Sequence, residues 1–294
     1  MTDIRARAIA IYDAFTHEHL DRRRMLRDMI ALAGSAAAAE ALIAGIAASP
    51  AAAQRVAPDD RAIVASRIEL PVARFPALHG YRVVPAAPGG KRGAVIVIHE
   101  NRGLNGHIED VARRLALAGF LVLAPDLLSP WGGTPADEDR ARDMIARADP
   151  ATVMTMLLAA MTAVRGWSGG DGRVGAIGFC WGGATVNRLA VAAGERLDAG
   201  VVYYGPAPDP AEAGRVRAPL LLHFAGQDAR VNATGAPWVA ALRAAGRNVE
   251  AHDYPGVDHA FNNDTAADRY NAAAADLAWA RSIAFLHRHL DPRA

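Results

Sequence analysis

The sequence predicts an α/β fold in which a mostly parallel central sheet is covered by helices on both faces. From about residue 66 onward, short apolar runs alternate with amphipathic stretches. Strands that are apolar on both sides belong to sheets with both faces buried, and amphipathic stretches supply the crossover helices that parallel strands need. With 294 residues, 52% of them hydrophobic, the chain is long enough for one large domain with a sizeable core.

Each apolar run predicts a strand, and each amphipathic stretch predicts a helix. The predicted strands cover residues 94–98, 121–124, 174–177, 200–204 and 220–224, and a further strand begins at Val249. The predicted helices cover residues 108–118, 137–148, 151–167, 184–193, 237–245 and 266–290. This alternation indicates a single α/β domain over residues 66–294.

Residues 1–55 form an N-terminal extension that has two interpretations. Residues 22–24, all arginine, precede an alanine-rich apolar stretch and an Ala-x-Ala end before Gln54, which are the parts of a twin-arginine export signal. Asp21 and Glu40 are unusual in such a signal. The alternative is a helical appendage that packs on the domain or on a second subunit. Export, with cleavage at that end, predicts a periplasmic protein, and an appendage predicts a cytoplasmic one.

Composition and charge argue against several kinds of partner and site. The net charge is +1 and the two signs are interspersed, so nucleic acid is not an expected partner. One cysteine, Cys180, cannot form an internal disulfide, and no Cys/His spacing indicates a zinc site. The apolar N-terminal stretch carries Glu40, so a stable membrane span is not expected.

One loop after a predicted strand has the glycine spacing that surrounds a catalytic nucleophile. Ligands of open α/β sheets bind beyond the carboxyl ends of the strands. There the chain reads Gly178-Phe-Cys180-Trp-Gly182, the thiol form of a nucleophile elbow. The tight turn needs tiny residues two positions before and after the nucleophile, and it presents an exposed thiol at a helix N-terminus that favours the thiolate. The alternative is a buried structural cysteine.

Two later loops supply an acid and a histidine in the chain order of α/β-hydrolases. Asp228 follows the strand at 220–224, and His259 lies between the strand at Val249 and the last helix. His259 is expected to exchange a proton with the thiol, and Asp228 is expected to hold its tautomer. Asp228 could instead cap the following turn, and Asp258 is a competing carboxylate.

The loop after the strand at 94–98 carries Glu100. A charge at the end of a central strand needs a partner or a function. The same loop commonly supplies one oxyanion donor, and the amide after the nucleophile supplies the second. The backbone amides of Asn101 and Trp181 are therefore the predicted oxyanion hole.

From about Glu69 to Leu290 the chain resembles the dienelactone hydrolase family, the carboxymethylenebutenolidase-like proteins. The resemblance is carried by VIVIHENRGLN, LALAGFLVLAPDL, GRVGAIGFCWGG, YYG, PLLLHFAGQD and PGVDHAFNND. A bacterial subgroup with HENRGLN, IEDVARR and a similar N-terminal extension is still more similar. The resemblance implies a triad of Cys180, His259 and Asp228, an acyl-thioester intermediate, and no metal or organic cofactor.

The resemblance also implies a role for Glu100, whose carboxylate pairs with the thiol in the resting enzyme and is displaced when substrate binds. A thiolate–imidazolium pair then forms only with substrate present, which protects the sulfur from oxidation.

The chain departs from the family where the substrate carboxylate is held. Family members that act on the chlorocatechol-pathway lactone carry two arginines there, and the corresponding loops here read PDLLSPWGG and HAFNND. Arg102, Arg140 and Arg269 are the candidates to replace them. The expected pocket residues are Arg102, Trp131, Tyr204 and Phe261, although Trp131 and Trp181 could equally be packing residues.

The sequence thus predicts a cysteine-dependent hydrolase that acts on a small-molecule ester or lactone. One alternative is a general carboxylesterase or thioesterase for small apolar acyl groups. Another is a non-catalytic α/β-hydrolase-fold protein that binds a ligand or partner, although a complete set of four site residues argues against it. A homodimer is one option for the assembly.

Overall fold

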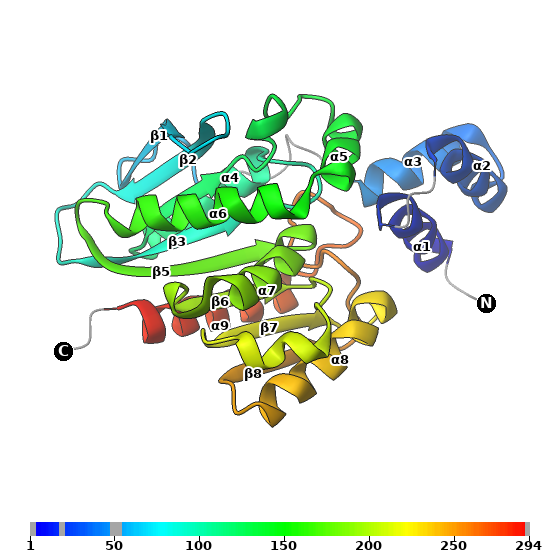
Figure 1. Ribbon diagram of the computed structural model, residues 1–294. Helices are drawn as coiled ribbons and strands as arrows, with labels where there is room; N and C mark the ends of the chain where they lie inside the picture. Colours follow the sequence, from blue (N-terminus) through cyan, green and yellow to red (C-terminus); the bar gives the residue numbers. More distant parts are fainter. Residues whose placement is uncertain (1–3, 18–20, 48–54, 292–294) are drawn as a thin grey trace.

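The computed structural model describes residues 4–17, 21–47 and 55–291, and over these residues the chain forms an eight-stranded sheet (Figure 1). The strand order is β1-β2-β4-β3-β5-β6-β7-β8, in which the pairs from β4 to β8 are parallel and those of β2 with β1 and β4 are antiparallel. The strands are β1 (Ile63–Leu70), β2 (Leu78–Pro85), β3 (Arg92–Ile98), β4 (Leu121–Pro125), β5 (Gly170–Phe179), β6 (Ala199–Tyr203), β7 (Leu220–Ala225) and β8 (Val249–Tyr254).

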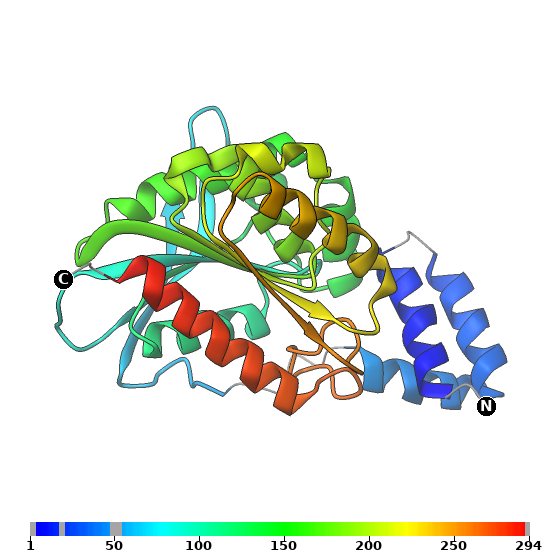
Figure 2. The same cartoon turned by 90° about the horizontal axis from the view of Figure 1, so that it is seen from below.

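Helices cover both faces of the sheet, as predicted (Figure 2). Helices α6, α7 and α8 pack on one face, and α4 and α9 pack on the other. The α-helices of this part are α4 (Gly106–Leu117), α5 (Glu138–Arg147), α6 (Pro150–Arg165), α7 (Trp181–Ala193), α8 (Ala229–Ala244) and α9 (Ala272–Leu290). The short 3-10 helices are η1 (Ser129–Trp131), η2 (Gly194–Arg196) and η3 (Pro210–Arg215).

The predicted elements differ from the observed ones in three places. Strands β1 and β2 were not predicted, because polar residues such as Arg67 and Arg82 interrupt their apolar residues, although β2 is half buried. Helix α8 begins at Ala229 rather than Pro237, because the Asp228 side chain accepts a hydrogen bond from the Val231 amide and caps the helix. Helix α9 begins at Ala272, and the residues just before it form turns.

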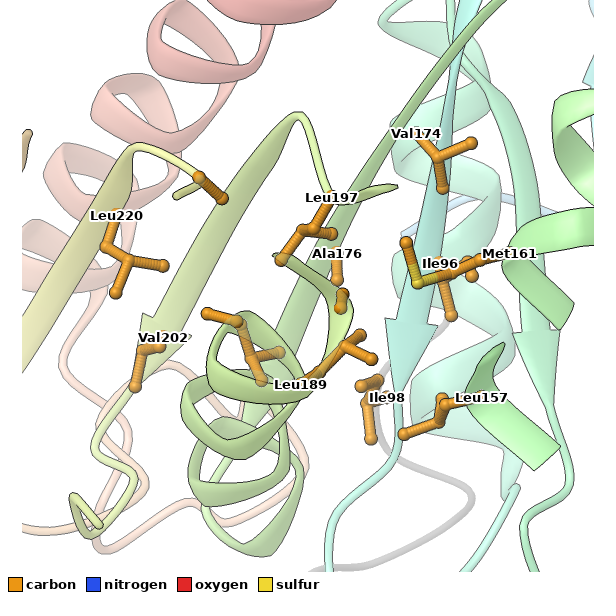
Figure 3. Close-up of a cluster of buried hydrophobic side chains, with 14 of the residues drawn as sticks. Ile96, Ile98, Leu157, Met161, Val174, Ala176, Leu189, Leu197, Val202 and Leu220 are labelled. Atoms are coloured by element: carbon orange, nitrogen blue, oxygen red, sulfur yellow. The ribbon is translucent and has the colours of Figure 1, made fainter. Parts of the chain in front are cut away.

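Apolar side chains fill the space between the sheet and its helices on each face. On one face, Leu157 and Met161 of α6 and Leu189 of α7 pack against Ile96 of β3 and Ala176 of β5 (Figure 3). This core fixes the central strands, and the loops that follow their carboxyl ends are thereby brought together at one edge of the sheet.

The N-terminal extension contains three helices, α1 (Ile4–His17), α2 (Arg22–Ala33) and α3 (Ala36–Ile46). They share a small core that includes Tyr12, Phe15 and Met29. Figure 1 shows them beyond the carboxyl ends of the strands, next to α5. The predicted cleavage end before Gln54 lies outside the described residues, so the choice between export signal and appendage stays a prediction.

None of the described helices is by itself long and apolar enough to cross a membrane. The pairs α2–α3 and α5–α6 reach that length only when joined, and they are bent by 110° and 101°.

We expect the core around α7 to be intolerant of cavities. Leu189→Ala should lower the free energy of unfolding by about 2–5 kcal/mol, because Leu189 is fully buried and its neighbours are held by the sheet. Leu277→Ala on α9 is the control, since Leu277 is 48% exposed and its truncation should change stability by less than about 0.5 kcal/mol. Urea denaturation followed by circular dichroism measures both, and equal effects would contradict this assignment of the core.

Candidate active site

Cys180 lies in a strained turn between β5 and α7. Its backbone has φ 53° and ψ −114°, a conformation that residues with a side chain rarely adopt. The turn is held by the Cys180 amide, which donates to the Tyr203 carbonyl at 3.0 Å. A Cβ at Gly178 would lie 2.2 Å from the Gly182 carbonyl oxygen, and one at Gly182 would lie 2.3 Å from the Ile98 carbonyl oxygen. Only glycine therefore permits this approach of the backbones.

The thiol itself is buried, which corrects the expectation of an exposed sulfur. Cys180 is 5% exposed, because the loops around it and helix α1 close over the turn. The turn does present the side chain at the beginning of α7, where the helix dipole favours a negative charge.

His259 connects Cys180 to Asp228. The His259 Nδ1 and the Asp228 Oδ2 are 2.5 Å apart, and the Cys180 side chain is close enough to the His259 ring to act on its charge. The other carboxylate oxygen of Asp228 accepts from the Val231 amide at 3.1 Å. Asp228 therefore caps α8 and orients the imidazole at the same time, so the two interpretations of this residue are compatible.

The surroundings of His259 favour its charged form. Burial lowers its pKa, but the charge of the Cys180 sulfur and the hydrogen bonds with Asp228 and Cys180 outweigh burial and raise the pKa to about 10. Burial likewise opposes the charged form of Asp228, yet the bond to His259 holds the pKa of this carboxyl below its usual range. The arrangement thus favours the imidazolium form of His259 at neutral pH.

Glu100 follows β3 and faces the same pocket as Cys180. One of its carboxylate oxygens accepts a hydrogen bond from the Asn263 side-chain amide at 2.9 Å, and the other is buried with no hydrogen-bond partner among the described groups. The loop is held by His99, whose Nδ1 lies 2.7 Å from the Glu100 carbonyl oxygen and whose ring stacks on Trp181 at 5.4 Å.

The two residues of the predicted oxyanion hole come from adjacent elements. Asn101 lines the pocket, and its side-chain amide donates to the Thr16 carbonyl at 3.2 Å. Trp181 is the first residue of α7, so its amide has no acceptor within the helix. Both residues thus flank the sulfur, one at the loop after β3 and one immediately after Cys180.

The pocket beside Cys180 is small, about 30 Å³, and helix α1 forms one of its walls. Its lining residues are Tyr12, Thr16, Glu100, Asn101, Arg102, Cys180, His259, Ala260, Asn263 and Arg269. Sequence reasoning missed Tyr12 and Thr16, because nothing in α1 indicates contact with loops so distant in the chain. It also missed the role of Asn263, which lies in the HAFNND loop where the family arginine was expected.

Of the arginine and tryptophan residues predicted to line the pocket, two do so and two do not. Arg102 and Arg269 line the pocket, whereas Arg140 is exposed on α5. Trp131 is 40% exposed on η1 and is not among the lining residues.

Two aromatic residues expected in the pocket lie behind His259 instead. The Tyr204 ring is 5.0 Å from the His259 ring and 5.5 Å from the Phe261 ring, and both tyrosine and phenylalanine are fully buried. Among the residues that the structure describes, no group of three or more histidine, cysteine or acidic side chains is placed to hold a metal ion.

Comparison with known proteins identifies the family of this site. The model of the dienelactone hydrolase family matches residues 78–290. The chain belongs to the dienelactone hydrolase family. It is therefore a hydrolase with the α/β-hydrolase fold, as predicted.

Individual dienelactone hydrolase relatives cover most of the chain. A provisionally named carboxymethylenebutenolidase of Methylorubrum extorquens is 32% identical over 252 residues, or 80% of this chain and 85% of its own. Another, of Escherichia coli, is 32% identical over 258 residues, or 83% of this chain and 94% of its own. The crystal structure of a provisionally named dienelactone hydrolase of Klebsiella pneumoniae superposes with a TM-score of 0.70 at 30% identity, covering 77% of this chain and 99% of that one.

The pKa of His259 tests whether Asp228 is its partner. Asp228→Asn should lower that pKa from about 10 by roughly one unit or more, because the variant loses the charge that stabilises the imidazolium. The ring ¹⁵N chemical shifts of His259, followed against pH, measure it. Asp258→Asn is the matched control and should leave the titration nearly unchanged. A larger shift in Asp258→Asn would make Asp258 the partner.

Proposed function

We propose that the protein hydrolyses a carboxylic ester or lactone with Cys180 as nucleophile, His259 as general base and acid, and Asp228 as the residue that orients His259. One observation carries the proposal: the His259 ring bonds to Asp228 and lies in the same pocket as Cys180, whose side chain acts on its charge. A thiol, an imidazole and a carboxylate in this sequence of contacts are the requirements for an activated cysteine nucleophile.

The first half-reaction acylates Cys180. The thiolate attacks the acyl carbon, a C–S bond forms, and the carbonyl electron pair moves onto oxygen. The backbone amides of Asn101 and Trp181 donate to this oxyanion. The tetrahedral adduct then collapses, the C–O bond of the ester breaks, and the leaving alkoxide takes the proton of the His259 imidazolium. An acyl-thioester and an alcohol result, and in a lactone the alcohol remains part of the acyl group.

The second half-reaction returns the enzyme to its starting state. His259 accepts a proton from a water molecule, and the resulting hydroxide attacks the thioester carbon. The C–S bond breaks, the carboxylic acid leaves, and the thiolate is again paired with the imidazolium. Between turnovers the imidazolium can return its proton to the sulfur, and the carboxylate oxygen of Glu100 that is not bonded to Asn263 can then accept a hydrogen bond from the thiol, which is oxidised less readily than a thiolate.

A general esterase for small acyl groups is the second candidate, and the small volume of the pocket favours it over an enzyme for bulky lactones. A non-catalytic binding protein is disfavoured, because such a role does not require Asp228, His259 and Cys180 to be arranged in this order at one pocket.

Substitution of the nucleophile tests the proposal. With p-nitrophenyl acetate as substrate, Cys180→Ala should lower kcat/KM by at least about a thousandfold. Cys180→Ser should lower it by at least about a hundredfold, because His259 would have to deprotonate a much weaker acid. Thr185→Ser, a conservative change on the same helix, is the control for folding and should retain activity. Undiminished hydrolysis by Cys180→Ala would require a different nucleophile.

A further inference from the structure

Helix α1 completes the wall of the pocket beside the proposed nucleophile. Tyr12 and Thr16 line this pocket together with Cys180 and His259. The remaining volume of about 30 Å³ has room for only a few water molecules. An acyl group bound to Cys180 must therefore contact α1 or push it outward, so the side chains of α1 help to decide which acyl groups enter.

The N-terminal helices are anchored to the elements that carry the pocket. The Arg142 guanidinium of α5 lies 3.8 Å from the centre of the Phe15 ring. The Asp268 amide donates to the Gly45 carbonyl at 3.0 Å, next to the pocket residue Arg269. Because these contacts join the extension to the pocket loops at two separate places, α1 has a defined position over the pocket.

Both arginines of the pocket are already paired with groups of this chain. The Arg102 guanidinium donates to the Glu138 carboxylate at 2.9 Å and to the Tyr12 hydroxyl at 2.7 Å. The Arg269 guanidinium donates to the Asp13 carboxylate at 3.1 Å and is itself largely buried. Each positive charge is thus balanced before any substrate arrives.

Asp13 also acts electrostatically on the catalytic residues. Burial raises its pKa, and the charges of His259, Arg269 and Arg230 oppose that rise while Asp228 reinforces it. Asp13 is therefore close enough to His259 for their charges to interact. Glu100 lines the pocket itself, and Asp13 adjoins it through its ion pair with the lining residue Arg269.

We propose that Asp13 is a specificity-determining residue, which occupies the Arg269 guanidinium and so selects small uncharged acyl groups against acyl groups that carry a carboxylate. A substrate carboxylate would have to enter a confined site that Glu100 lines and Asp13 adjoins, in which both lining arginines are already paired. A neutral acyl group meets no such repulsion. This inference rests on the proposed ester hydrolysis, and it requires that α1 remain attached in the active enzyme.

Two substrates of similar acyl length separate charge from size. They are p-nitrophenyl pentanoate, which is neutral, and mono-p-nitrophenyl succinate, which carries a carboxylate. For the wild type, kcat/KM should be at least about tenfold higher for the neutral ester. Asp13→Asn removes the charge and exposes that of Arg269, so the ratio of kcat/KM for the anionic to the neutral ester should rise about tenfold or more, chiefly through a lower KM for the anionic ester.

Two further variants make the test specific. Asp28→Asn removes an equal charge from the exposed carboxylate of Asp28 on α2 and should leave the ratio unchanged. The double variant Asp13→Asn/Arg269→Gln should lose the gain of Asp13→Asn, because the released guanidinium is then absent. Circular dichroism establishes that each variant is folded, and the ratio is independent of the fraction of active enzyme.

The outcomes distinguish this inference from the function on which it rests. An unchanged ratio in Asp13→Asn would overturn the inference, as would an equal acceleration of both esters, which would make α1 a steric cover without charge selection. A wild-type preference for the anionic ester would also overturn it. Failure of the wild type to hydrolyse p-nitrophenyl acetate and both of these esters would overturn the proposed function as well.

Discussion

The site depends on the close approach of backbones around Cys180. Gly178 and Gly182 let β5, α7 and the end of β3 meet at distances that any side chain would prevent. Residue 180 is held there with a positive φ, and strain of this kind costs about 1–3 kcal/mol and persists only where the surrounding core enforces it. The packed sheet provides that restraint, so the conformation of the proposed nucleophile depends on the packing of the core.

The charged side chains around Cys180 are balanced by partners within the chain. His259 lies between the Cys180 sulfur and the Asp228 carboxylate, and both favour its protonated form despite complete burial. Around this pair each charged side chain already has a partner within the chain. Glu100 accepts from Asn263, Arg102 pairs with Glu138, and Arg269 pairs with Asp13. In a confined site, ion pairs that exist before binding determine whether a charged substrate group finds a partner there. The N-terminal helices therefore belong to the electrostatics of the pocket, although the family match begins only at residue 78.

Local patterns predicted most of the fold and the centre of the site, and contacts between distant segments escaped them. The parallel strands and their helices were predicted because buried apolar runs identify them, whereas polar residues interrupt the apolar residues of β1 and β2. The glycine spacing around Cys180 indicated the turn. The burial of that thiol and the part played by Asp13 were not predictable, because they arise where α1 meets loops more than eighty residues away.

Trapping the covalent intermediate tests the central claim most directly. Enzyme quenched in acid during turnover of p-nitrophenyl acetate would be digested and analysed by mass spectrometry. The account predicts an acetyl group on the peptide that contains Cys180, removable by hydroxylamine and lost once the substrate is consumed. An acetyl group that forms and turns over on a different residue, with Cys180 unmodified throughout, would contradict it.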